Sequence, residues 1–211
     1  MSKKAIGKIE KLGVEHFKKP GRKLYFVPLL FSGGKSEKKV PKEYLAKVKI
    51  YWDEVENRLG DLKAKVGKIN RVYHELVDIG GEKGLEVIKN LNKRSYQITR
   101  KFFQEGGVLE AMENGNLVKE SVDWTRCLAA GLQSEKALRK ISQFYIETVQ
   151  KREEFITREI DKTLKDNEIG IIFIREDNNI KFPSDIEIFR VYPPILDDIH
   201  RYLRDLRPKG K

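Results

Sequence analysis

The stretch from Val48 to Leu76, VKIYWDEVENRLGDLKAKVGKINRVYHEL, carries the clearest periodic pattern in the chain. Its apolar residues follow one another at alternating steps of four and three: Val48, Trp52, Val55, Leu59, Leu62, Val66, Ile69, Tyr73 and Leu76. This repeat is typical of a long helix that buries a narrow seam against other helices. We therefore predict one helix from about Lys42 to Asp78, which has Gly60 and Gly67 inside it and ends at Gly80-Gly81.

A second long helix is predicted from Ser134, a favourable N-cap residue, to about Lys165. Its apolar residues recur once per helical turn, and Arg152 is the one polar residue among them. We expect two helices of this length to pack antiparallel on each other. The alternative is that they mediate a homodimer. Trp52 and Tyr73 are bulky for a simple two-stranded coil, which favours packing within the chain.

Short apolar segments near both ends of the chain are typical of β-strands. The turn-rich sequence Glu176–Asn179 is expected to reverse the chain after the apolar segment 169–174. These segments have no other partners, so we expect them to share one small mixed sheet. Their ranges are 23–31, 169–174, 180–182 and 186–192.

The predicted fold class is therefore α+β and mainly helical, with two long antiparallel helices packed against a small mixed sheet formed by N- and C-terminal strands. We expect a basic N-terminal arm over residues 1–22 and a single domain over residues 23–211. Within that domain the helical body covers about 42–165 and the β-rich part about 169–206. Shorter helices are predicted at about 82–91, 93–105, 117–130 and 195–206.

The net charge of +11 is concentrated at the two ends of the chain. Residues 1–42 carry +9 and residues 201–211 carry +4, so the remainder is slightly acidic. This asymmetry suggests an anionic partner, with nucleic acid first and a membrane surface second, although a lysine-rich chain can simply be soluble. The candidate phosphate contacts are Lys3, Lys4, Lys8, Lys18, Lys19, Arg22, Lys23, Arg201, Arg204 and Arg207.

Base recognition would need exposed aromatic side chains, for which Tyr25, Phe173 and Phe189 on the predicted strands are candidates. Each of the three could equally belong to the core. No named nucleic-acid-binding motif occurs in the sequence.

The loop Ser32–Ser36 is a candidate anion-binding site. Gly33 and Gly34 would let backbone N–H groups face a phosphate, and Lys35 and Ser36 would add a charge and a hydroxyl. A complete P-loop would need glycine at position 29, where the chain has Leu29. The loop is therefore an incomplete phosphate-binding motif, and a plain flexible loop is the alternative.

Two carboxylates, Glu176 and Asp177, follow the apolar segment that ends at Ile174. At the end of a strand in a parallel sheet, such side chains can act as ligands for metal or water. The turn sequence after them favours two solvated hairpin carboxylates. His74 and Asp78 have the spacing of two metal ligands on a helix, but no third ligand is evident. We predict no metal site and no cofactor.

Cys127 is the single cysteine, which excludes an internal disulfide and favours a reducing, cytoplasmic location. No apolar run is long enough for a transmembrane segment. The function predicted first is a non-enzymatic binding or scaffold protein that contacts nucleic acid or another polyanion through its basic ends. The alternative is an enzyme or ligand-binding domain for a phosphorylated small molecule, with the Ser32–Ser36 loop on the phosphate.

Overall fold

The computed structural model describes residues 20–31 and 40–206, and its centre is a five-stranded sheet. All strand pairs are parallel, and the strand order is β3-β2-β4-β1-β5. The bounds are β1 (Arg22–Pro28), β2 (Arg71–His74), β3 (Val108–Leu109), β4 (Ile169–Ile174) and β5 (Ile186–Arg190).

Alternate residues of the central strands face opposite sides of the sheet. In β1, Tyr25 and Val27 belong to one buried cluster, and Leu24 and Phe26 belong to the other. β1 and β4 are buried along their whole length, which is why β4 and the part of β1 from Leu24 onward read as continuous apolar runs rather than alternating ones.

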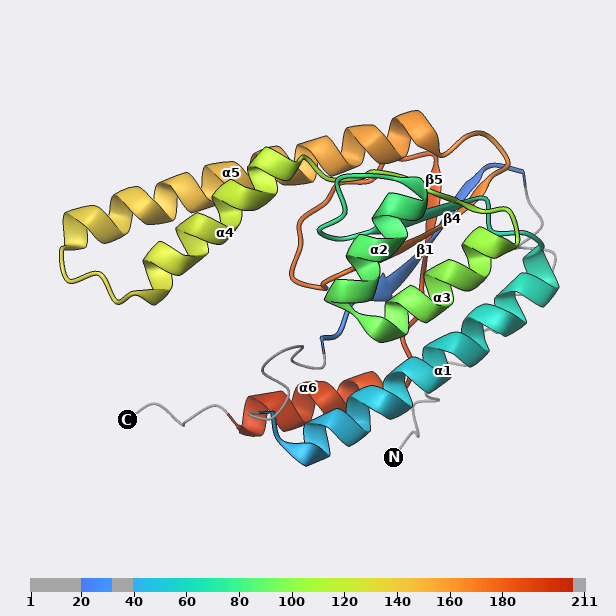
Figure 1. Ribbon diagram of the computed structural model, residues 1–211, viewed down its shortest axis with the longest axis horizontal. Coiled ribbons are helices and arrows are strands. Elements are labelled where there is room, and N and C mark those ends of the chain that lie inside the picture. The colour runs from blue at the N-terminus through green and yellow to red at the C-terminus, as the bar shows by residue number, and fades with distance from the viewer. Residues whose placement is uncertain (1–19, 32–39, 207–211) are drawn as a thin grey trace, which may run out of the picture.

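Helices cover both faces of this sheet (Figure 1). α5 (Glu135–Thr163) packs its C-terminal half on one face. The opposite face is covered by α1 (Lys42–Val66), α2 (Gly81–Leu91), α3 (Lys93–Gln104) and α6 (Ile195–Asp205). α4 (Gly115–Ala129) pairs with the N-terminal half of α5, and the two project beyond the sheet as a helical arm in Figure 1.

The predicted fold class is wrong, because the molecule is a mixed α/β fold with an all-parallel sheet and not an α+β fold with a mixed sheet. The two long helices do not pack on each other, since α1 and α5 lie on opposite faces of the sheet. Parallel strands need crossover connections, which helices supply between β1 and β2, β2 and β3, and β3 and β4, whereas β4 and β5 are joined by a segment without a helix. The apolar run of β4 is therefore the mark of a strand buried on both faces by helices.

The helix predicted to reach Asp78 ends at Val66. Gly67 adopts a φ of 100°, and its N–H donates to the Lys63 carbonyl, which closes the helix. Tyr73 lies in β2 instead, and the heptad spacing beyond Gly67 is a coincidence of a loop and a short strand. The seam residues up to Leu59 are buried in the chain's own core. A homodimer through the long helices stays a prediction.

The C-terminal region also differs from the prediction. Residues 180–182 form no strand, and the turn after β4 does not lead into a hairpin. The chain instead crosses over β1 and returns as β5, parallel to it. The predicted helix from Ser134 is confirmed, and the Ser134 hydroxyl accepts the Ala137 N–H at its N-terminus.

Candidate ligand site at the carboxyl edge of the sheet

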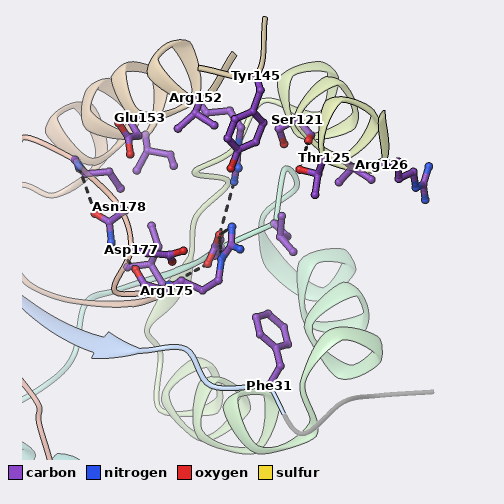
Figure 2. Close-up of a pocket in the computed structure, with 17 residues that line it drawn as sticks. Phe31, Ser121, Thr125, Arg126, Tyr145, Arg152, Glu153, Arg175, Asp177 and Asn178 are labelled. Atoms are coloured by element: carbon purple, nitrogen blue, oxygen red, sulfur yellow. Dashed lines mark hydrogen bonds and ion pairs between the residues drawn. The ribbon is translucent and has the colours of Figure 1, made fainter. Parts of the chain in front are cut away.

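Because all strands are parallel, their carboxyl ends meet at one edge of the sheet, where a pocket of about 360 Å³ opens. Phe31 comes from the segment after β1, Glu75 follows β2, and Arg175 follows β4. The arm supplies the opposite wall of the pocket (Figure 2). The lining residues are Phe31, Glu75, Leu76, Ser121, Val122, Thr125, Arg126, Tyr145, Val149, Arg152, Glu153, Ile156, Ile174, Arg175, Asp177, Asn178 and Ile180.

The position of the pocket follows from the topology. The connections after β1 and β2 lead to α1 and α2 on one face, and the connection after β4 runs along the other face, where Ile180 and Phe182 pack against the cluster that includes α5. Neighbouring strands in the order β2-β4-β1 therefore send their loops to different sides, which opens a crevice between the loops. In open α/β sheets, ligands bind in this crevice.

A chain of buried charges forms the floor of the pocket. The Glu75 carboxylate accepts both the backbone N–H of Arg175 and its side-chain Nε–H, each at 2.9 Å. Arg152 of α5 lies 3.9 Å from Glu75 and donates from Nε and Nη2 to Glu113. The side chain of Glu113 has no exposed surface, and it also accepts the Leu76 N–H at 3.1 Å.

Such a network is required on electrostatic grounds. A buried carboxylate is stable only when opposite charges and hydrogen-bond donors surround it. Glu75 and Glu113 meet this condition through Arg152 and Arg175. Burial lowers the pKa of Arg175, but the hydrogen bond and charge of Glu75 outweigh that effect, so the pKa lies above its ordinary value.

Two arginines of this network keep donors that the network does not use. Within residues 20–31 and 40–206, the Nη1 groups of Arg152 and Arg175 make no hydrogen bond. The Arg175 side chain is 51 % exposed, and Arg175 lines the pocket. Tyr145 of α5 points toward Arg175 in Figure 2, and in the described part of the chain its hydroxyl makes no hydrogen bond.

Beside this network lies His74, the last residue of β2, which is fully buried. Its Nδ1 is 2.7 Å from the Glu75 carbonyl oxygen, which can only accept, so Nδ1 carries the proton. Nε2 then accepts from the Ser95 hydroxyl of α3 at 2.9 Å. Burial lowers the pKa of His74 to about 4, and the hydrogen bond to the Glu75 carbonyl opposes this only in part. The neutral imidazole therefore links β2 to α3 through the hydrogen bond with Ser95.

Strained backbone also marks this edge. Leu76 adopts a φ of 66°, a left-handed conformation that branched, bulky residues rarely take. It occupies a tight turn in which the Val77 N–H donates to the His74 carbonyl at 3.2 Å. The bond from the Leu76 N–H to Glu113 holds the turn in place, and the Leu76 side chain forms part of the pocket wall.

Comparison of the chain with protein-family models, with curated proteins and with solved structures found no match. No group of three or more histidine, cysteine or acidic residues in the described ranges is arranged to hold a metal. Across the same ranges, no helix is both long enough and apolar enough to cross a membrane.

The sequence-predicted residues fall in different places. Asp177 lines the pocket, whereas Glu176 lies outside it and pairs with His200 of α6 at 2.7 Å. Gly33, Gly34, Lys35 and Ser36 lie outside the described residues, but Phe31, directly before that loop, lines the pocket.

The basic residues predicted to contact phosphate also lie in different parts of the chain. Lys3, Lys4, Lys8, Lys18, Lys19 and Arg207 lie outside the described residues. Arg22 and Lys23 are buried in β1, where the Arg22 guanidinium is held by Asp161 and Asp185. Arg201 and Arg204 are exposed on α6. Of the candidate base-stacking residues, Tyr25 and Phe173 are fully buried, and Phe189 is partly buried.

Sequence reasoning missed the residues that build the pocket floor: Glu75, Glu113, Arg152 and Arg175. One signal was present, because Arg152 interrupts the apolar face of α5, and an arginine in such a position needs a buried carboxylate. The positions of Glu75 and Arg175 directly after strands gain meaning only once the strands are known to be parallel.

Proposed function

We propose that the protein binds a small anionic molecule, one that carries a phosphate or carboxylate group, in the pocket at the carboxyl edge of the sheet. The observation that carries the proposal is the pair of open donors, Nη1 of Arg175 and the Tyr145 hydroxyl, above a floor of charges that are already paired. Glu75 holds the Arg175 guanidinium in one orientation, so its remaining edge is preorganised for an oxyanion.

The other walls fit a small polar molecule. A volume of about 360 Å³ is in the range of small-ligand pockets, and Phe31, Leu76, Val149 and Ile156 supply apolar surface. Arg126 adds a further positive charge at the side of the arm. The Ser32–Ser36 loop continues directly from the Phe31 wall in sequence, which supports the phosphate-binding alternative drawn from the sequence.

Calorimetric titration of the full chain with inorganic phosphate, pyrophosphate, citrate and a nucleoside 5′-monophosphate tests this proposal. We expect at least one of them to bind with measurable heat. Tyr145→Phe should weaken that binding about 10- to 100-fold, because a hydrogen bond to a charged group contributes about 1.5–3 kcal/mol. Arg175→Gln should weaken it about 10- to 100-fold.

Arg139→Gln is the matched control, since Arg139 is exposed on the arm and pairs only weakly with Glu135 at 3.5 Å. It should bind like the wild type. Because Arg175→Gln also disturbs Glu75, Tyr145→Phe is the cleaner variant, and its unfolding midpoint should match that of the wild type. The proposal is wrong if none of the four anions binds, or if Tyr145→Phe and Arg175→Gln both bind as tightly as the wild type.

A further inference from the structure

A second hollow, of about 480 Å³, lies on the surface of α3 and shares no lining residue with the carboxyl-edge pocket. Four cationic side chains line it, namely Lys89 from the end of α2 and Lys93, Arg100 and Lys101 from α3. Tyr96 and two glutamines complete the lining, and no carboxylate takes part. We call this surface the α3 basic face.

The cations of the α3 basic face are available for an outside partner. Lys93 and Arg100 are exposed, and they form no ion pair with any residue in the described part of the chain. Lys89 pairs with Glu86 at 3.3 Å and Lys101 with Glu56 at 4.0 Å, and all four of these side chains are about half exposed or more. Solvated pairs of this kind contribute little and exchange easily for a stronger anion.

The donors also form a line. Lys93, Gln97, Arg100 and Gln104 follow one another at steps of four, three and four, which places them along one side of the helix. The line is about 16 Å long at 1.5 Å per residue. One strand of B-form nucleic acid presents a phosphate about every 3.4 Å along its axis, so this length can face about five phosphates.

We infer that the α3 basic face binds the sugar-phosphate backbone of a nucleic acid. Lysine, arginine and glutamine side chains are the usual donors to phosphate oxygens, and such contacts need no base recognition. A membrane surface is a poorer partner, because amphipathic membrane helices insert large apolar side chains, and none of the exposed large apolar residues lines this hollow. The basic ends of the chain are a separate prediction, since α3 belongs to neither end.

The α3 basic face begins beside the carboxyl edge of the sheet. Asn92, the N-cap residue of α3, donates from its side-chain amide to the Leu30 carbonyl at 2.8 Å. Leu30 immediately precedes Phe31 of the pocket wall. A nucleic-acid strand along α3 would therefore have one end near the pocket, yet its contacts with the face do not depend on a ligand there.

Fluorescence-anisotropy titration of a labelled 20-nucleotide single-stranded RNA, and of a duplex DNA of the same sequence, tests the inference between 50 and 300 mM salt. The test variant is K93E/R100E, and K93Q/R100Q is a milder version. The matched control is K136E/K140E, which reverses two exposed lysines at the far end of the arm. Each charge-reversed variant lowers the net charge from +11 to +7.

We expect the wild type to bind, and K93E/R100E to bind about tenfold or more weakly at 100 mM salt. The salt dependence of its affinity for single strands should fall by about 1.4 in logarithmic slope, which corresponds to two lost contacts. K93Q/R100Q should show the same direction of change with unaltered circular dichroism, and K136E/K140E should bind like the wild type. Tyr145→Phe should leave the binding unchanged, which separates this inference from the proposed pocket.

Three outcomes would overturn the inference. The first is the absence of binding by the wild type at 50 mM salt. The second is an equal loss in K136E/K140E, which would show an effect of net charge alone, or a loss in R201E/R204E without one in K93E/R100E. The third is binding to phosphatidylserine vesicles with no binding to either nucleic acid.

Discussion

Arg22 at the amino edge of the sheet donates all five of its side-chain N–H groups, whereas Arg175 at the carboxyl edge lines a pocket and has one nitrogen that donates no hydrogen bond within the described residues. Arg22 contacts Asp161, Asp185 and two backbone carbonyls at the end of α5. Arg71, also at the amino edge, is held by Glu168 on one side and Glu110 on the other. Every side-chain nitrogen of Arg22 and Arg71 therefore donates a hydrogen bond, whereas Arg152 and Arg175 each have one nitrogen that donates none within the described residues.

Each edge also has a turn with a left-handed residue, and only the turn at the amino edge has a residue type that suits this conformation. Asn167, before β4 at the amino edge, has a φ of 62°, which asparagine tolerates well, and its side chain accepts the Gly21 N–H at 3.1 Å. Leu76 adopts nearly the same φ at the carboxyl edge, without a residue type suited to it. The amino edge is therefore arranged for stability, whereas the carboxyl edge combines burial, backbone strain and unused donors, as binding sites do.

The largest effect is expected from Arg152→Met, which leaves Glu75 and Glu113 buried without their shared partner. Breaking a buried ion pair in this way costs about 3–5 kcal/mol of unfolding free energy, measured by urea denaturation. Arg22→Met should cost less, about 1–2 kcal/mol, because Asp161 and Asp185 are more than half exposed and can be hydrated. An equal loss of unfolding free energy in both variants would contradict the view that the buried charges at the carboxyl edge depend more strongly on their partner than those at the amino edge.

A smaller effect is expected from pH through His74. Its pKa is about 4 in the folded chain and about 6.5 when unfolded, so the unfolded state binds the proton first as the pH falls. Its contribution is complete above pH 6.5 and is lost progressively toward pH 4. Between pH 7.5 and 5 the loss should be about 2 kcal/mol.

His74→Gln should remove this part of the pH dependence in urea denaturation repeated at each pH. Glu168 must be treated separately. The hydrogen bond from Arg71 lowers its pKa, so its contribution is present above its ordinary value and disappears only as the pH falls below it. Unchanged pH dependence in His74→Gln between pH 7.5 and 5 would count against a neutral, buried His74.

The smallest effect is expected at the two left-handed turns. Leu76→Gly should be neutral or stabilising by up to about 1 kcal/mol, because relief of the backbone strain offsets the greater entropy of the unfolded chain. Asn167→Gly should be neutral or slightly destabilising, since the bond to Gly21 is lost. Thermal unfolding of both variants measures the difference in stability. A larger gain in stability from Asn167→Gly than from Leu76→Gly would contradict the assignment of backbone strain to Leu76.

Much of the local structure could be predicted from the sequence, because apolar periodicity and caps are local signals. The helix from Ser134 and the strands at β1, β4 and β5 follow from such patterns. The arrangement of the strands could not, since parallel pairing depends on which faces the helices cover. The error at β2 has a definite cause: Gly67 ends the helix, and the residues after it continue the helical spacing by coincidence.

The candidate site was predicted only in part for the same reason. Asp177 was identified from its position after an apolar strand, and it does line the pocket. Its neighbours Glu75 and Glu113 come from segments 38 residues apart in the sequence, and only the order of the strands brings them to one edge. Leu76 gave no signal, because leucine is not a residue that predicts a turn.

The attachment of α5 has a mechanical consequence. Arg152 pins the middle of this helix to Glu113, and Asp161, near its C-terminal end, holds Arg22. At 1.5 Å per residue, the helix extends about 25 Å from Arg152 toward the tip of the arm and about 13 Å from Arg152 to Asp161. Because Ile156 and Ile160 are buried against the sheet between these two points, the C-terminal part of the helix is a fixed base, and the arm beyond Arg152 projects from it as a cantilever.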